Sequence, residues 1–145
     1  MRFSRWLFLL TFFVFSCTQA GPPDQAEIQR FLNQYFSTWS SQDMQGYENC
    51  FASTARITFV EASGQSTSQG LTDFIHGQKL SHERSTDPMK EVPTQMKIQG
   101  DSRVAQAEVR WKLTKGQETV TGTDFFTLIR TQQGWKIAAL VFYND

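Results

Sequence analysis

Two polar side chains fall among apolar ones in patterns that would bury them. Asp124 shares a strand face with Val120, Phe126 and Leu128, and Tyr35 lies on the apolar stripe of a helix. Burial disfavours the carboxylate and raises the pKa of an aspartic acid. A neutral acid and a phenol could then donate hydrogen bonds that orient a ligand. The alternative is a structural role, with Asp124 held by Tyr35 or by a backbone amide.

The other reactive residues do not predict a metal or cofactor site. His76 and His82 are six residues apart, which is not the spacing that places two ligands on one helical face. Cys50 has no neighbouring histidine to activate it, so we expect a small buried residue. No glycine-rich phosphate loop occurs. We therefore expect no metal and no cofactor.

The first 20 residues have the pattern of a signal peptide. Arg2 and Arg5 precede an apolar run over residues 6–15, which is too short to span about 30 Å of hydrocarbon. Residues 14–17, Val-Phe-Ser-Cys, resemble a bacterial lipobox and imply lipid attachment at Cys17; the alternative is cleavage after Ala20. We expect a protein of the bacterial cell envelope, lipid-anchored or periplasmic, with secretion as the alternative.

The remaining chain suits one domain over residues 26–145, joined to the signal by a linker over residues 21–25. Without residues 1–16 it carries 12 Lys and Arg against 14 Asp and Glu, with no basic run. A protein that binds nucleic acid needs a basic surface. We therefore expect no nucleic-acid partner, and contact with a membrane only through the signal or the lipid.

Helical spacing is clearest near the start of this domain. The apolar residues follow a capping Asp24 at intervals of three and four and form one stripe: Ile28, Phe31, Leu32, Tyr35, Phe36 and Trp39. Asp43 can cap a short second helix, and a weaker pattern predicts a third over residues 73–84, capped by Thr72. Residues 63–70 are polar and are predicted to form a loop.

Alternating residues predict strands over 56–62, 94–99, 103–114, 119–131 and 135–143. The order of elements predicts an α+β domain, with three N-terminal helices packed on a curved antiparallel sheet. Strand 103–114 has one apolar face and one polar face, whereas strand 135–143 is apolar at both parities. An outward apolar face needs a second partner, and we expect a homodimer through it.

The pattern resembles the nuclear transport factor 2-like superfamily, which has a cystatin-like fold, and within it the SnoaL-like cyclases and ketosteroid isomerases. The likeness is carried by residues 35–43, by Phe51-Ala52 and by residues 134–138, and it covers about residues 25–143. It implies a cone with an aromatic pocket, and this fold hosts enzymes, binders and assembly modules.

The resemblance implies roles for three residues. Tyr35 stands where ketosteroid isomerases keep an oxyanion-binding phenol, Asp124 where they keep a protonated acid, and Phe59 where they keep the general base. A phenylalanine cannot move a proton. The candidate pocket residues are Tyr35, Trp39, Phe59, His76, Trp111, Asp124 and Phe126.

Two functions follow from these residues. The first is a non-catalytic domain that binds a small hydrophobic ligand or a protein partner. The alternative is a SnoaL-like cyclase, isomerase or dehydratase acting on a small carbonyl compound, for which His76 at the pocket mouth would have to supply the base.

Overall fold

The computed structural model describes residue 22 and residues 24–145. The predicted signal over residues 1–20, including Cys17, and part of the predicted linker lie outside the described residues. None of the described helices is long and apolar enough to cross a membrane.

Three helices precede or interrupt the strands, as the sequence predicts. They are α1 (Gln25–Ser40), α2 (Met44–Glu48) and α3 (Leu71–Arg84). The Asp24 side chain accepts the backbone N–H groups of Ala26 and Glu27, which confirms it as the cap of α1. The predicted cap of α3 is wrong, because that helix begins at Leu71 and Gly70 caps it without a side-chain hydrogen bond.

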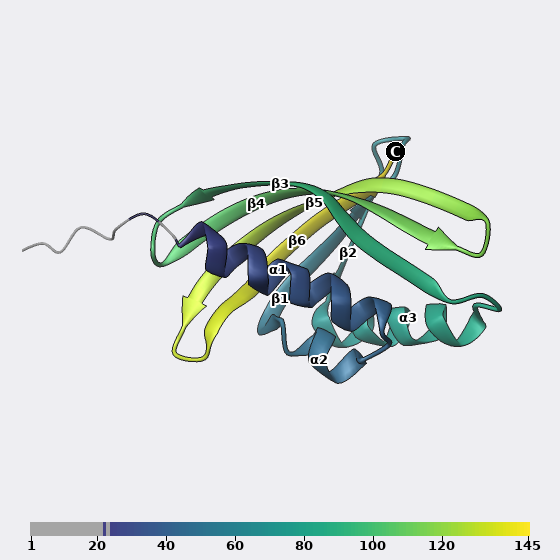
Figure 1. Cartoon of the computed structure of the whole chain (residues 1–145), viewed down its shortest axis with the longest axis horizontal. Coiled ribbons are helices and arrows are strands. Elements are labelled where there is room, and N and C mark those ends of the chain that lie inside the picture. The colour runs from purple at the N-terminus through teal and green to yellow at the C-terminus, as the bar shows by residue number, and fades with distance from the viewer. Residues whose placement is uncertain (1–21, 23) are drawn as a thin grey trace, which may run out of the picture.

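Six strands form one sheet, whose concave side faces the helices (Figure 1). The strands are β1 (Phe51–Val60), β2 (Ser66–Gly70), β3 (Met89–Gly100), β4 (Val104–Lys115), β5 (Glu118–Thr131) and β6 (Gly134–Asn144). Their order across the sheet is β2-β1-β6-β5-β4-β3. All neighbours are antiparallel except β1 and β6, which run parallel, so the sheet is mostly rather than wholly antiparallel.

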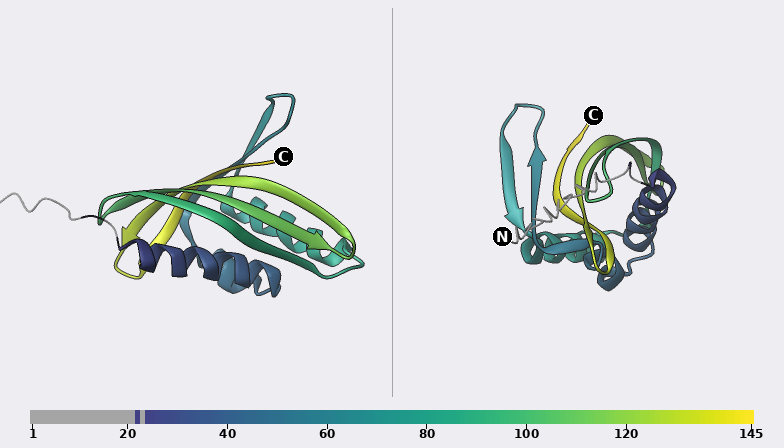
Figure 2. Two further views of the ribbon diagram at one scale, coloured as in Figure 1. Left: turned by 45° about the horizontal axis from the view of Figure 1, so that its top comes forward. Right: turned by 90° about the vertical axis from the view of Figure 1, so that its left-hand side faces the viewer.

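The predicted loop over residues 63–70 contains a strand. Strand β2 pairs with β1 from Val60↔Ser66 to Arg56↔Gly70, and this hairpin stands away from the rest of the molecule (Figure 2). Both faces of β2 are polar and largely exposed. A strand without a buried face has no alternating apolar pattern, and the sequence analysis therefore missed it.

Strand β3 begins five residues earlier than predicted, at Met89 rather than at residue 94. Proline has no backbone N–H to donate to a neighbouring strand and is depleted from strand interiors. The structure accommodates Pro93 because β3 is an edge strand and its register with β4 shifts between Pro93 and Gln95.

The last strand is not apolar on both faces in the way its parity predicts. A register shift between β5 and β6 at Thr127/Leu128 changes which residues share a face. Trp135 and Ile137 are therefore buried together with Leu140, while Val141 is exposed. The inner face of β6 joins the core, and its outer face carries a smaller apolar surface.

Candidate functional site

Asp124 lies on the inner face of β5, as its strand parity predicts. Only 3% of its surface is exposed. Its carboxyl Oδ1 accepts the indole N–H of Trp111 at 2.8 Å, across the β4–β5 pair. The sequence analysis named both residues as pocket candidates but did not predict that they bond to each other.

Tyr35 does not hydrogen-bond to Asp124, contrary to the expected pair. Its hydroxyl instead accepts the hydroxyl of Tyr47 at 2.8 Å, and their rings lie 4.8 Å apart. Tyr47 comes from α2, which the Asp43 cap starts in the turn after α1. No local pattern in the sequence assigns a role to Tyr47.

Glu91 is a functional candidate that the sequence analysis missed. It pairs with Leu113 of β4 and lies on the inner side of β3, and part of its surface is exposed. One hydroxyl fixes its backbone: Ser40 Oγ donates to the Glu91 carbonyl at 3.0 Å and accepts the Glu91 N–H at 2.9 Å. The end of α1 is thereby joined to the edge of the sheet at this residue.

The two carboxyl groups influence each other inside the protein. Burial raises the pKa of Asp124 to about 7, and the hydrogen bond from Trp111 acts in the opposite direction. Enough protein surrounds the Glu91 carboxyl that burial also raises its pKa well above the usual range, and the nearby Asp124 raises it further. No basic side chain of the described residues contributes to either pKa.

The two tyrosines belong to the same electrostatic cluster. Burial raises the pKa of Tyr35 and that of Tyr47 well above the ordinary value. Asp124 and Glu91 raise both values further, so the phenols stay protonated. Four groups that can share or donate protons therefore face one interior: Tyr35, Tyr47, Glu91 and Asp124.

Aromatic rings surround this polar cluster. Phe126 lies edge-on to Tyr35 with ring centres 5.2 Å apart, and Phe51 lies 5.9 Å from the same ring. Phe126 and Trp39 are buried, and the indole N–H of Trp39 donates to Gln78. Phe59 is half-buried and packs on Phe142 at 5.2 Å. These rings form a dry environment that strengthens the electrostatic effects within it.

The two histidines have different surroundings from those expected. His76 is exposed on α3, so it does not lie with the buried acids and cannot serve as their base. His82 is buried instead, with its ring 4.4 Å from that of Trp39 and no hydrogen-bond partner for either nitrogen. Among the described residues, no group of three His, Cys, Asp or Glu side chains is arranged to hold a metal ion.

A groove of about 570 Å³ runs between α1 and β3. Phe36, Ser37 and Ser40 line it from α1, and Glu91, Val92 and Pro93 line it from β3. Glu91 thus belongs both to this groove and to the interior carboxyl pair. No local sequence pattern predicts the groove, because it depends on how α1 packs against an edge strand.

Cys50 is buried, as expected, and its environment makes it unreactive. Burial raises the pKa of its thiol to about 11. A thiol is nucleophilic only as the thiolate, which is scarce at neutral pH under these conditions.

Comparison with known families gives one match that covers most of the chain. A family model described as putative lumazine-binding matches residues 23–143. No curated protein matches the chain.

Solved structures with the same fold come from several bacteria. A nuclear transport factor 2-like protein of unknown function from Pseudomonas putida superposes with a TM-score of 0.69 at 15% identity, covering 85% of this chain and 89% of that one. A protein of unknown function with a cystatin-like fold from Nostoc punctiforme gives 0.68 at 14% identity, with 84% and 91% covered. A protein of unknown function from Mycobacterium tuberculosis gives 0.67 at 22% identity, with 83% and 70% covered. At these identities the likeness establishes the nuclear transport factor 2-like fold alone.

Proposed function

Because this chain belongs to the family described as putative lumazine-binding, we propose that it binds a small hydrophobic ring compound without transforming it. Lumazine is a planar nitrogen heterocycle, with apolar faces and a polar edge. A site for such a compound needs aromatic or aliphatic walls and a few convergent polar groups. The aromatic interior around Asp124, Tyr35 and Tyr47 has this composition, and Glu91 connects it to the groove between α1 and β3.

The observation that carries the proposal is the pair of carboxyls without a basic partner. Ion pairs and hydrogen bonds normally compensate buried acids. Here Asp124 has one bond, from Trp111, and no described basic side chain acts on it or on Glu91. An uncompensated acid in an apolar setting costs stability, and proteins retain such groups mainly at functional sites.

Binding can be tested with lumazine and the purified protein. We expect saturable binding in isothermal titration calorimetry, and a small molecule that copurifies in native mass spectrometry. A protein that binds no small molecule in either experiment would instead support a domain that binds a protein partner.

The alternative is a SnoaL-like cyclase, isomerase or dehydratase acting on a small carbonyl compound. Phe59 and the exposed His76 cannot supply its base, but Glu91 lies within electrostatic reach of Asp124. Two carboxyls whose pKa values differ can divide the roles of base and acid. If the protein is such an enzyme, it should catalyse deuterium exchange at the α-carbon of a cyclic ketone in D₂O. The Glu91→Gln variant should lose that exchange. The absence of exchange favours binding alone.

We also propose that the protein is exported and anchored through lipid on Cys17. Residues 14–17 support this, as do Arg2 and Arg5 before the apolar run. Cys17→Ser should release the protein from the membrane fraction into the soluble fraction. A wild-type protein that is already soluble and begins at Gly21 would contradict lipid attachment and favour a periplasmic or secreted form.

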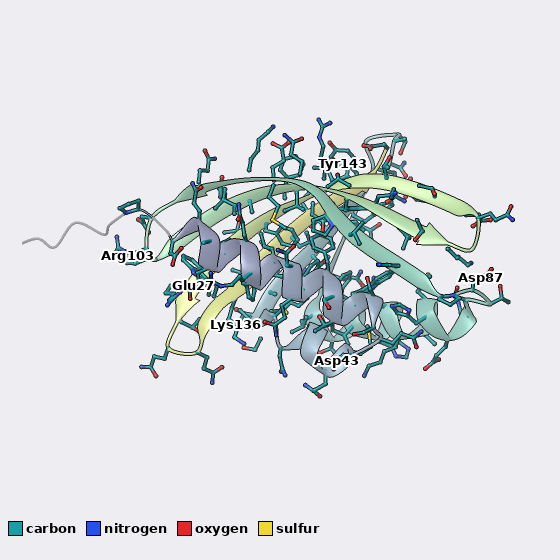
Figure 3. The ribbon with its side chains drawn as sticks, viewed as in Figure 1. Glu27, Asp43, Asp87, Arg103, Lys136 and Tyr143 are labelled. Atoms are coloured by element: carbon teal, nitrogen blue, oxygen red, sulfur yellow. The ribbon has the colours of Figure 1, made fainter. Side chains whose placement is uncertain are left out.

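We further propose a homodimer through the outer face of β5 and β6. Phe125 is 43% exposed and Val141 38% exposed, and the ring of Phe125 lies 6.2 Å from that of Tyr143. Tyr143 lies on the side of the sheet away from the helices (Figure 3). Lys97 and Glu108 on the same face form an ion pair at 3.1 Å. Opposite charges beside an apolar centre suit contact with a second, identical copy.

A further inference from the structure

The residues at the centre of the interior leave little room for a ligand to touch them directly. Asp124, Tyr35, Trp111 and Phe126 are all buried, and their rings pack against one another. Glu91 differs because it keeps exposed surface and also lines the groove between α1 and β3. A molecule in that groove can therefore reach one member of the carboxyl pair without opening the core.

The groove has the size and composition of a small-ligand site. Its volume of about 570 Å³ lies within the roughly 300–1,000 Å³ of typical ligand pockets. Val92 and Pro93 give it apolar lining beside the buried Phe36, while Ser37 and Asn33 place polar groups along its α1 side and Lys90 lies on its β3 side. One or two fused rings could lie against the apolar surface and keep a polar edge free to bond.

The backbone of Glu91 is fixed before any ligand arrives. Its backbone N–H and carbonyl are both bonded to the Ser40 hydroxyl, so the strand cannot slide along α1 at this point. A group held in its binding geometry loses little entropy when a ligand binds. The carboxyl has no basic partner among the described residues, and it therefore suits a ligand that brings N–H donors.

We propose that the α1–β3 groove binds a planar nitrogen heterocycle, with the Glu91 carboxyl receiving the N–H groups of its edge. This inference rests on the proposed small-ligand function and assigns the site and the chemical class of the ligand. The buried Asp124 acts behind Glu91, because its charge favours the protonated form of Glu91. A protonated Glu91 can both accept an N–H and donate to a ring carbonyl, which matches a cyclic amide edge.

Lumazine and 1,3-dimethyllumazine provide a matched pair of probes, because the second lacks the ring N–H donors. We expect lumazine to bind at least tenfold more tightly than its dimethyl analogue in calorimetry. Glu91→Met removes both the acceptor and the donor at similar size, and it should weaken lumazine binding about tenfold and reduce the preference between the two probes. Ser37→Trp, at an exposed position of α1, should fill the groove and abolish binding while leaving the fold intact.

A control variant, Glu48→Gln, alters a carboxyl in a different groove beside α2 and should leave lumazine binding unchanged. If lumazine binds Glu91→Met and Ser37→Trp as tightly as wild type, the groove assignment is wrong and the small-ligand function stands. The assignment is also overturned if a copurifying small molecule persists in Ser37→Trp. If the wild type holds neither lumazine nor a copurifying small molecule, the small-ligand function fails, and the groove assignment fails with it.

Discussion

The two faces of β5 contain similar apolar residues in opposite surroundings. Phe126 points toward the helices and is 2% exposed, whereas the adjacent Phe125 points away from them and is 43% exposed. The inner face also carries Asp124 and Leu128, both buried. Three helices cover the inner face, and no described element covers the outer face (Figure 1). Whether a phenylalanine on this strand belongs to the core is therefore decided by what lies above it, not by its own chemistry.

This difference assigns the two proposed functions to opposite faces of one sheet. The inner face is dry enough to shift the pKa of a carboxyl, so its polar residues can act on a small molecule. The outer face is wet and apolar in patches, and it is suited to contact with another protein chain.

The largest contrast is expected between Phe126→Ala and Phe125→Ala. Removal of a buried phenylalanine side chain costs about 3–5 kcal/mol, because it loses burial and leaves a cavity. Removal of the exposed neighbour should cost less than about 1 kcal/mol in the monomer. Urea unfolding at low protein concentration measures both values. Equal losses would show that the outer face is also covered in the native protein.

The pH dependence of stability should come from the inner face. A carboxyl with a raised pKa in the folded state stabilises the fold below its unfolded pKa of about 4, and that stability is lost as the pH rises toward about 7. The slope is about 1.4 kcal/mol per pH unit, which gives a loss of about 4 kcal/mol at most. Asp124→Asn keeps an oxygen for the Trp111 N–H and should remove much of this slope.

Urea melts from pH 4 to pH 8 check this expectation, and Asp101 provides a control of opposite sign. Hydrogen bonds from the backbone of Val104 and Arg103 lower the pKa of this exposed acid. The stability that Asp101 contributes is therefore lost as the pH falls. Asp101→Asn should leave unchanged the loss of stability that Asp124 causes as the pH rises. A wild-type stability that stays constant between pH 4 and pH 7 would show that Asp124 is compensated by a group the structure does not reveal.

The outer face should respond to charge where the inner face responds to volume. Val141→Glu places a carboxylate at an exposed position and should weaken the proposed dimer at least 100-fold, or about 2.7 kcal/mol, without unfolding the monomer. Leu140→Glu is the inner-face reference, because Leu140 is 1% exposed and a charge there should prevent folding. Sedimentation velocity measures the dimer. A wild type that stays monomeric at tens of micromolar would rule out this interface.

The smallest effect is expected at His82, on the buried side of α3. Burial lowers the pKa of His82, so its stabilising effect is present above the unfolded pKa of about 6.5 and is lost as the pH falls through the lower folded pKa. His82→Phe keeps a ring against Trp39 and removes two unpaired nitrogens, so it should be neutral or stabilising by about 1 kcal/mol at pH 7. Thermal melts at pH 5 and pH 7 should show the larger gain at pH 5. A larger gain at pH 7 would mean that the fold stabilises the protonated imidazole and raises the pKa of His82.

Much of the local structure follows from the sequence. The stripe from Ile28 to Trp39 predicts α1, and the alternation in β4 predicts its dry and wet faces. The alternation of residues in β5 likewise places Asp124 on the inner face of the sheet. These features are encoded by residues within one element, whose repeat of about 3.6 or 2 positions fixes which side chains share a face.

The tertiary structure alone decided which of these residues meet. Asp124 is bonded to Trp111, and Tyr35 to Tyr47, because strand register and helix packing bring together residues that no local repeat relates. Glu91 enters the site because an edge strand tolerates Pro93 and is tied to Ser40. The register shift at Thr127/Leu128 reverses the faces of β6 partway along its length. Periodicity determines the direction of a side chain within its element, whereas its partners depend on the pairing of elements distant in the chain.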